Sequence, residues 1–194
     1  MIIVDELKEG FNIMLHPKSA TQKERKIGEA LLFYYKISII PLLLYIILSL
    51  VILIYLAGLS PTAMFFFGMS AMSGILVFLL IIPISIFVIA FISQIFGRLF
   101  KVFKNPYSNT FTATVYGALP TILFYWLGLL PLGSSVLIIF ELWTFIIMVF
   151  ALAKQQKTSI IKAFAVTIIT LITVGIIEFI AVTTGLGSIP SPAL

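Results

Sequence analysis

Long apolar segments separated by clusters of basic residues limit what this chain can fold into. All twelve Lys and Arg residues fall in three clusters: Lys8, Lys18, Lys23, Arg25, Lys26 and Lys36; then Arg98, Lys101 and Lys104; then Lys154, Lys157 and Lys162. The turns 58–61 and 131–134, which lie between clusters, carry no charge. Apolar segments of about 20 residues are long enough to cross the hydrocarbon core of a bilayer. The alternation therefore predicts an all-α, polytopic membrane helical bundle.

Composition agrees with this interpretation. The chain is 61% hydrophobic and only 10% charged, whereas a soluble domain needs more charge to cover its surface. There is no cysteine, which excludes disulfides, thiolate metal sites and a thiol nucleophile. The first apolar segment begins too late for a cleavable signal peptide, so we expect none.

The basic clusters also predict the topology. Lys and Arg stay on the cytoplasmic side of a membrane. The three clusters can all do so only if the N-terminus is cytoplasmic, the number of spans is odd and the C-terminus is outside. Five transmembrane helices in the cell membrane satisfy this, at about 37–57, 74–96, 110–130, 134–153 and 160–183.

The second segment is too long for one simple crossing. Residues 62–96 would form a helix of roughly 52 Å, longer than the bilayer core. Small residues in Phe67–Gly74 predict a break there, which would leave 62–72 as an interfacial or re-entrant piece. The spacing of Ser70 and Gly74 would alternatively let two helices approach closely, but we favour the break. Pro83 and Pro120 are expected to kink their helices.

The N-terminal residues 1–30 are predicted to be a cytoplasmic segment with a short amphipathic helix. Val4, Leu7, Phe11 and Met14 recur at helical spacing, and the helix should end at His16–Pro17. We favour a helix packed under the bundle over one that docks a partner. The membrane domain then covers 31–184, and 185–194 form a short outer tail.

Signatures of enzymes are missing from the sequence. The single histidine, His16, precedes a proline and is expected to be a cap or surface residue. The sequence contains no H-E-x-x-H, no Gly-rich phosphate loop and no G-x-S-x-G. The basic clusters flank spans without interleaved aromatic residues, which argues against nucleic acid. We therefore expect a protein that is not an enzyme and has no cofactor.

Two acids lie inside apolar segments, and they are the candidate site. Glu141 shares a helical face with Thr144; Glu178 shares one with Thr167 and is flanked by Thr170. No Lys or Arg lies in the outer half, and an unpaired carboxylate in hydrocarbon is costly. Each acid is therefore either a neutral carboxyl bonded to hydroxyls of other helices or part of a water-filled site for a cation or proton. The sequence leaves both possibilities open, and it does not say whether a metal binds.

Two stretches resemble the Yip1 family of five-span membrane proteins: "FTATVYGALPTILFYWLGLLP" and "KQQKTSIIKAFAVTIITLI". The first carries a Tyr four residues before a Pro, here Tyr116 and Pro120. The second carries a Ser/Thr-x-x-Lys-Ala start of the last span, here Ser159, Lys162 and Ala163. The short segment before the first span, "HPKSATQKE", resembles prokaryotic members.

The resemblance implies a membrane organiser or adaptor of undefined biochemical role. The Asp-Leu-Tyr-Gly-Pro motif of eukaryotic members is absent, so binding of a Rab-type GTPase is not implied. The expected partners are the lipid bilayer and a second copy or another membrane protein. The alternative function is a small cation- or proton-linked transporter or channel-like protein that uses the intramembrane carboxyls.

Overall fold

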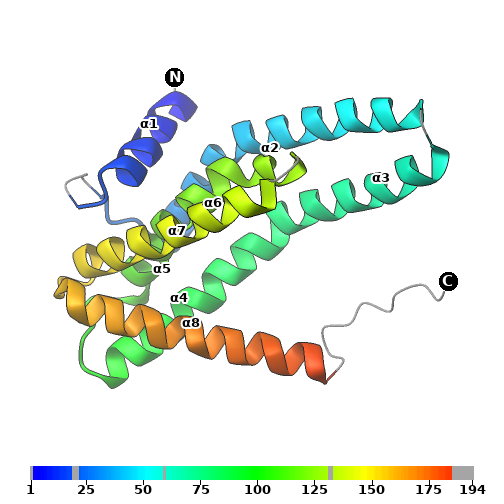
Figure 1. Cartoon of the computed structure of the whole chain (residues 1–194). Coiled ribbons are helices and arrows are strands. Elements are labelled where there is room, and N and C mark those ends of the chain that lie inside the picture. The colour runs from blue at the N-terminus through cyan, green and yellow to red at the C-terminus, as the bar shows by residue number, and fades with distance from the viewer. Residues whose placement is uncertain (1, 19–21, 59, 131–132, 185–194) are drawn as a thin grey trace.

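The structure is a computed structural model that describes residues 2–18, 22–58, 60–130 and 133–184. In these ranges the chain is helical and contains no strand (Figure 1). The α-helices are α1 (Ile2–Leu15), α2 (Ile27–Ala57), α3 (Pro61–Leu76), α4 (Ile82–Leu99), α5 (Tyr107–Gly117), α6 (Leu119–Phe124), α7 (Gly133–Gln155) and α8 (Ile160–Thr183). A π-helical turn, Val77–Ile81, joins α3 to α4, and a 3-10 turn, Tyr125–Leu129, follows α6.

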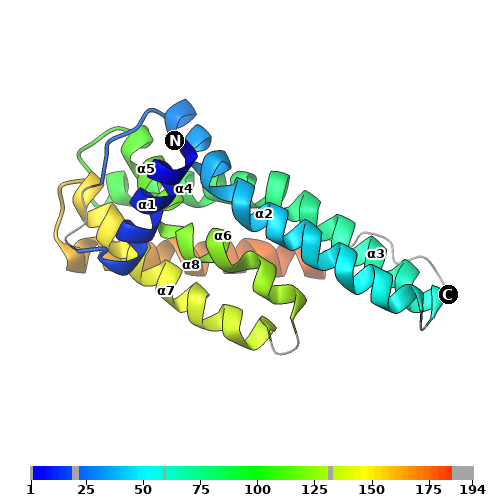
Figure 2. The same cartoon turned by 90° about the horizontal axis from the view of Figure 1, so that it is seen from above.

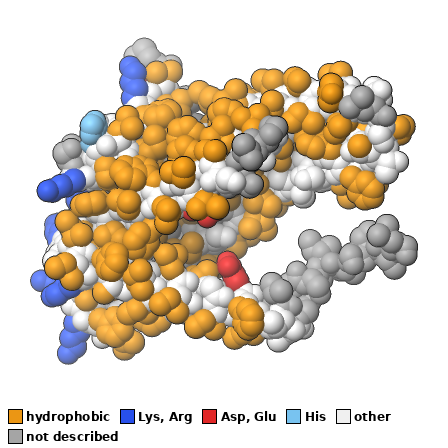
Figure 3. Space-filling view, in the orientation of Figure 1, with side chains coloured by type: hydrophobic (Ala, Val, Ile, Leu, Met, Phe, Trp, Pro, Cys, Tyr) orange, Lys and Arg blue, Asp and Glu red, His pale blue; other side chains and the backbone are white. Residues whose placement is uncertain are grey.

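Five helical segments are long and apolar enough to cross a membrane. They are Ile27–Ala57, Pro61–Leu99, Tyr107–Leu129, Ser135–Gln155 and Ile160–Ala181. The predicted all-α bundle with five transmembrane helices is therefore confirmed. Figure 3 shows the Lys and Arg side chains gathered at one end of the molecule, which we call the basic end.

The core of the bundle is built around α5. This helix lies against α4 and α7, with α2 also in contact, and every residue from Asn109 to Gly117 is buried. Small and polar residues such as Thr112 and Ala113 let the neighbouring helices approach it closely. The bundle is thus packed most tightly near its basic end, where α5 begins.

The first membrane helix is longer than predicted. α2 begins at Ile27 rather than near residue 37, and its start is capped by Glu29, which accepts from the Lys26 backbone N–H at 3.2 Å. Lys36 therefore lies inside the helix, and its Nζ pairs with Glu6 of α1 at 3.3 Å. With 31 residues, α2 is about 46 Å long. The hairpin of α2 and α3 consequently reaches beyond the ends of α7 and α8, as Figures 1 and 2 show.

The break predicted at Phe67–Gly74 is wrong, because α3 runs through these residues without interruption. Their small side chains serve helix packing instead. A Cβ on Gly74 would lie 1.9 Å from the Tyr45 hydroxyl of α2, so only glycine fits. With α3 intact, 62–72 are part of one long second segment and not a separate interfacial piece.

The irregularity of the second segment lies further along, at Val77–Ile81. The backbone N–H of Ile82 donates to the carbonyl of Val77, five residues back, and Pro83 has no N–H to give. The chain changes direction here (Figure 1). At Pro120 the helix is also interrupted: α5 and α6 are separated at Ala118, in agreement with the predicted kink.

The amphipathic helix predicted near the N-terminus is α1, and it ends at Leu15, just before His16–Pro17. It packs on α2, α5 and α6. Gly10, Ile13 and Met14 are buried in this contact, whereas Val4 and Phe11 of the predicted apolar face are exposed.

Candidate functional site

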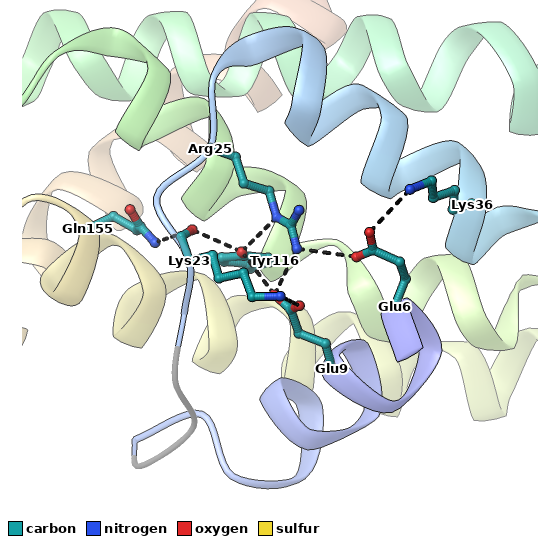
Figure 4. A network of polar contacts seen from close by, with 7 residues as sticks. All are labelled: Glu6, Glu9, Lys23, Arg25, Lys36, Tyr116 and Gln155. Atoms are coloured by element: carbon teal, nitrogen blue, oxygen red, sulfur yellow. Dashed lines mark hydrogen bonds and ion pairs between the residues drawn. The ribbon is translucent and has the colours of Figure 1, made fainter. Parts of the chain in front are cut away.

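In the part of the chain that the structure describes, four ion pairs gather around Arg25, two residues before α2 begins (Figure 4). Its Nη2 lies 2.8 Å from Glu9 Oε1 and 3.2 Å from Glu6 Oε2, both on α1. Only 11% of the Arg25 side chain is exposed. Charge-assisted bonds shielded from water in this way are stronger than bonds on an open surface.

Tyr116 holds Arg25 from the other side. This tyrosine of α5 is fully buried, and its hydroxyl accepts a hydrogen bond from Arg25 Nε at 3.1 Å and donates to the Lys23 carbonyl at 3.0 Å. Phe33 contributes to the same pocket: the Tyr116 ring meets it edge-on, and the guanidinium lies 4.3 Å from its centroid. The guanidinium is therefore fixed by two carboxylates, one hydroxyl and one ring.

Two lysines complete this group. Lys23 pairs with Glu9 at 2.7 Å, and Lys36 pairs with Glu6 at 3.3 Å. We call the set the Arg25 cluster: Glu6, Glu9, Lys23, Arg25, Lys36 and Tyr116. Burial acts to lower the pKa of Arg25, but hydrogen bonds and charge from Tyr116 and Glu9 outweigh it, and the net pKa lies above its usual value. The cluster thus keeps Arg25 charged and ties α1 to the bundle.

A second polar group adjoins the Arg25 cluster. We call it the amide cluster: Gln94, Asn105, Asn109, Thr110, Gln155 and Gln156. Gln155 Nε2 donates to the Lys23 carbonyl at 3.1 Å, which links the two groups. Gln156 Nε2 donates to Thr110 at 2.8 Å, and its Oε1 accepts from the Asn105 backbone at 3.0 Å. These uncharged contacts join α4, α5 and the end of α7, so the amide cluster stabilises the basic end of the bundle.

The two predicted carboxyls lie elsewhere. Glu141 of α7 and Glu178 of α8 are both exposed on the protein surface. In the described part of the chain, neither has a hydrogen bond or an ion pair. Figure 3 shows acidic side chains in a hollow of an otherwise hydrophobic face, away from the basic end.

The threonines predicted beside these carboxyls bond to other groups. Thr144 pairs with Thr121 of α6 at 3.0 Å, and Thr170 accepts from Ser93 of α4 at 3.1 Å. Thr167 donates to the Ala163 carbonyl in its own helix at 2.9 Å. The hydroxyls therefore join helices or satisfy the backbone, and the structure does not bring them to the acids.

Glu178 borders a small cavity with a mostly apolar lining. This residue lines a cavity of about 140 Å³ between α4 and α8, together with Ser85 and apolar side chains. Among the described residues there is no group of three or more His, Cys, Asp or Glu that could hold a metal ion. Any cation held by Glu141 or Glu178 would need water or further ligands.

The remaining motif residues have structural contacts. The Ser159 hydroxyl accepts from the Lys162 backbone N–H at 3.4 Å, as an N-terminal cap of α8 does. Ala163 and Pro120 are buried, and Lys162 is exposed. Of the motif, only Tyr116 belongs to a polar site.

The partners of Tyr116 were missed by the sequence reasoning. A usable signal existed, because Glu6 and Glu9 are three residues apart and so share a face of the predicted amphipathic helix. The basic run Lys23–Lys26 follows shortly after, and opposite charges on adjacent segments favour pairing.

Comparison with known proteins identifies the family. No curated protein and no solved structure matches the chain. The Yip1 domain matches residues 11–182, which include α2 to α8 almost entirely and both partners of the Arg25–Tyr116 contact. This match covers most of the sequence and includes all five apolar helices. The chain therefore belongs to the Yip1 family of multi-pass membrane proteins.

Proposed function

We propose that this protein is a non-enzymatic membrane organiser or adaptor that acts through its basic end, which faces the cytoplasm. The observation that carries the proposal is the Arg25 cluster, whose ion pairs tie α1 to the bundle surface. An adaptor needs a preformed contact surface, and a helix held by several ion pairs meets that need.

The outward face of α1 supports the same function. Because Glu6 and Glu9 turn inward, the exposed face carries Val4, Phe11 and Leu15, which are 51%, 41% and 61% exposed. These residues are seven and four positions apart and so lie in one stripe, which also contains the exposed Lys8 between Val4 and Phe11. A largely apolar stripe with one lysine, on a helix held by ion pairs, suits contact with the apolar face of another helix.

Photo-crosslinking in living cells tests this function. A benzophenone amino acid replaces Phe11 on the stripe or, as a control, Ile139, which is 64% exposed on α7. We expect discrete protein adducts from position 11 and only lipid adducts from position 139. Arg25→Gln should abolish the adducts from position 11, whereas Lys18→Gln, at an exposed site, should keep them. Adducts that are identical at both positions, or lipid adducts alone, would contradict the proposal.

The second candidate function is cation- or proton-linked transport. It is favoured by one observation: Glu141 and Glu178 are exposed carboxyls in membrane-spanning helices, with no partner in the described ranges. Such residues commonly mark ion paths. Flux into proteoliposomes, measured with dyes for protons, Na⁺ and Ca²⁺, distinguishes the two functions. The adaptor should give no flux above protein-free vesicles, whereas a transporter should give flux that Glu141→Gln or Glu178→Gln removes.

A further inference from the structure

A groove runs between α4 and α5 at the basic end. It has a volume of about 790 Å³ and is lined by Phe91, Gln94, Ile95, Arg98, Leu99 and Tyr107. Both helices belong to membrane-spanning segments, so the groove opens beside the bilayer, where the spans reach their charged ends.

One wall of the groove is apolar. Phe91, Ile95 and Leu99 follow one another at intervals of four residues, so they form a single stripe along α4. All three are exposed. A stripe of this kind is long enough to lie along part of an acyl chain, because each helical turn advances about 5.4 Å.

The groove carries an unneutralised cation at its basic end, beside Leu99. Arg98 donates from Nη2 to the Asn105 carbonyl at 2.9 Å, which orients the guanidinium. No carboxylate among the described residues pairs with Arg98, and the next two basic residues, Lys101 and Lys104, follow close by in the chain. The site is therefore complementary to an anion.

Tyr107 forms a wall of the groove on the membrane side of Arg98. Its hydroxyl donates to the Phe87 carbonyl at 3.1 Å, which holds the ring as a wall of the groove. Because Phe87 lies one helical turn before Phe91, the Tyr107 ring extends the apolar part of the groove toward the membrane.

We propose that this groove binds an anionic phospholipid from the leaflet at the basic end. The phosphate lies on Arg98, whose planar donors match phosphate oxygens, and one acyl chain lies along Phe91, Ile95 and Leu99. Basic pockets beside transmembrane helices recognise anionic lipid headgroups by this combination. The apolar wall commits the site to a lipid rather than free phosphate. The inference does not depend on the adaptor function, because it concerns a different face.

Native mass spectrometry of the full-length protein tests the site. Protein purified in detergent is mixed with phosphatidylglycerol or with phosphatidylcholine of the same chain length, and retained lipid is quantified. We expect phosphatidylglycerol to be preferred, and Arg98→Gln to weaken its retention about five-fold, the contribution of one cation at an anionic headgroup. Arg98→Lys should keep most of the preference, and Lys162→Gln, an exposed basic residue of α8, should keep all of it.

A second variant distinguishes binding of a whole lipid from binding of an anion alone. Its result does not depend on whether Arg98→Gln folds correctly. Ile95→Trp fills the apolar part of the groove, retains every charge and should reduce retention of phosphatidylglycerol. The proposal is overturned if Ile95→Trp or Arg98→Gln retains as much phosphatidylglycerol as the parent protein. It is also overturned if Lys162→Gln loses as much retained phosphatidylglycerol as Arg98→Gln does. Competition by 10-fold excess inorganic phosphate would equally overturn it, since a free anion would then satisfy the site.

Discussion

Arg25 donates from Nε to the hydroxyl of Tyr116 across 3.1 Å, and this bond joins residues that are 91 positions apart in the chain. Tyr116 lies in the most buried helix of the bundle, and Arg25 lies in the segment that leads out of α1. The bond therefore connects the N-terminal helix to the centre of the membrane domain.

Arg25→Gln should release α1. The change leaves Glu6 and Glu9 without their shared partner in a site where their side chains are only 16% and 14% exposed. We expect a loss of about 2 kcal/mol in the free energy of unfolding, between the values for exposed and buried ion pairs. Hydrogen exchange should accelerate across α1. Lys18→Gln is the matched control, and equal exchange in the two variants would show that Arg25 does not hold the helix.

Tyr116→Phe should cost less than loss of the whole side chain. The ring would still pack edge-on against Phe33, but Arg25 Nε and the Lys23 carbonyl would lose their hydroxyl partner. We expect destabilisation of about 1–2 kcal/mol by thermal unfolding in detergent. Tyr55→Phe, at a residue 68% exposed, should be neutral. A double-mutant cycle with Arg25→Gln should be non-additive, and strict additivity would argue against direct coupling.

Gly117→Ala should destabilise the bundle where α5 meets α7. The new Cβ would lie 2.8 Å from Met148 Cβ and 3.1 Å from Met148 Cα, and a backbone atom cannot swing aside. The expected cost is about 1–3 kcal/mol. Gly175→Ala in α8 meets nothing within 4 Å and should be neutral or stabilising by up to about 1 kcal/mol. Similar melting temperatures for the two variants would contradict the tight contact.

The intramembrane acids should tolerate neutral replacement. Glu141→Gln and Glu178→Gln are expected to unfold within about 0.5 kcal/mol of the parent. If the carboxyls were neutral groups bonded to hydroxyls of other helices, as one of the two sequence-based alternatives holds, leucine would cost more than glutamine, because it would strand the partner hydroxyls. In the structure neither carboxyl meets a hydroxyl of the described residues at hydrogen-bond distance, so we now expect leucine to be no worse. Melting curves across pH, with and without Na⁺ or divalent ions, check this. An ion response that the Gln variants lack would favour transport.

Single-cysteine labelling should place the basic end in the cytoplasm. The chain has no native cysteine, so each introduced thiol reports alone. Cysteines at Lys101 and Lys157 should be labelled from the cytoplasm, whereas cysteines at Thr62 and Ser135 should be labelled from outside, because basic residues stay inside. All four sites are exposed. Labelling of Thr62 and Lys101 from the same side would contradict the orientation.

Much of the architecture could be predicted from the sequence because its cause is local. Apolar length against bilayer thickness, together with the segregated basic clusters, gives five spans, and the prolines mark where helices end or bend. The prediction failed at Phe67–Gly74, where small residues are compatible with either a helix break or close packing. Only the position of Tyr45 on the neighbouring helix decides between the two.

The sequence by itself therefore determined the membrane class, the number of spans, the segregated basic end and the family motif at Tyr116 and Pro120. Tertiary structure decided which polar groups meet. The hydroxyl of Tyr116 contacts Glu9, a residue 107 positions away in the sequence. Gln155 donates to the carbonyl of Lys23, a residue 132 positions away. Such contacts cannot be read from spacing, because they depend on how α1, α5 and α7 pack together. The same packing leaves Glu141 and Glu178 exposed on the surface. The sequence had predicted either hydrogen bonds from these carboxyls to hydroxyls of other helices or a water-filled site.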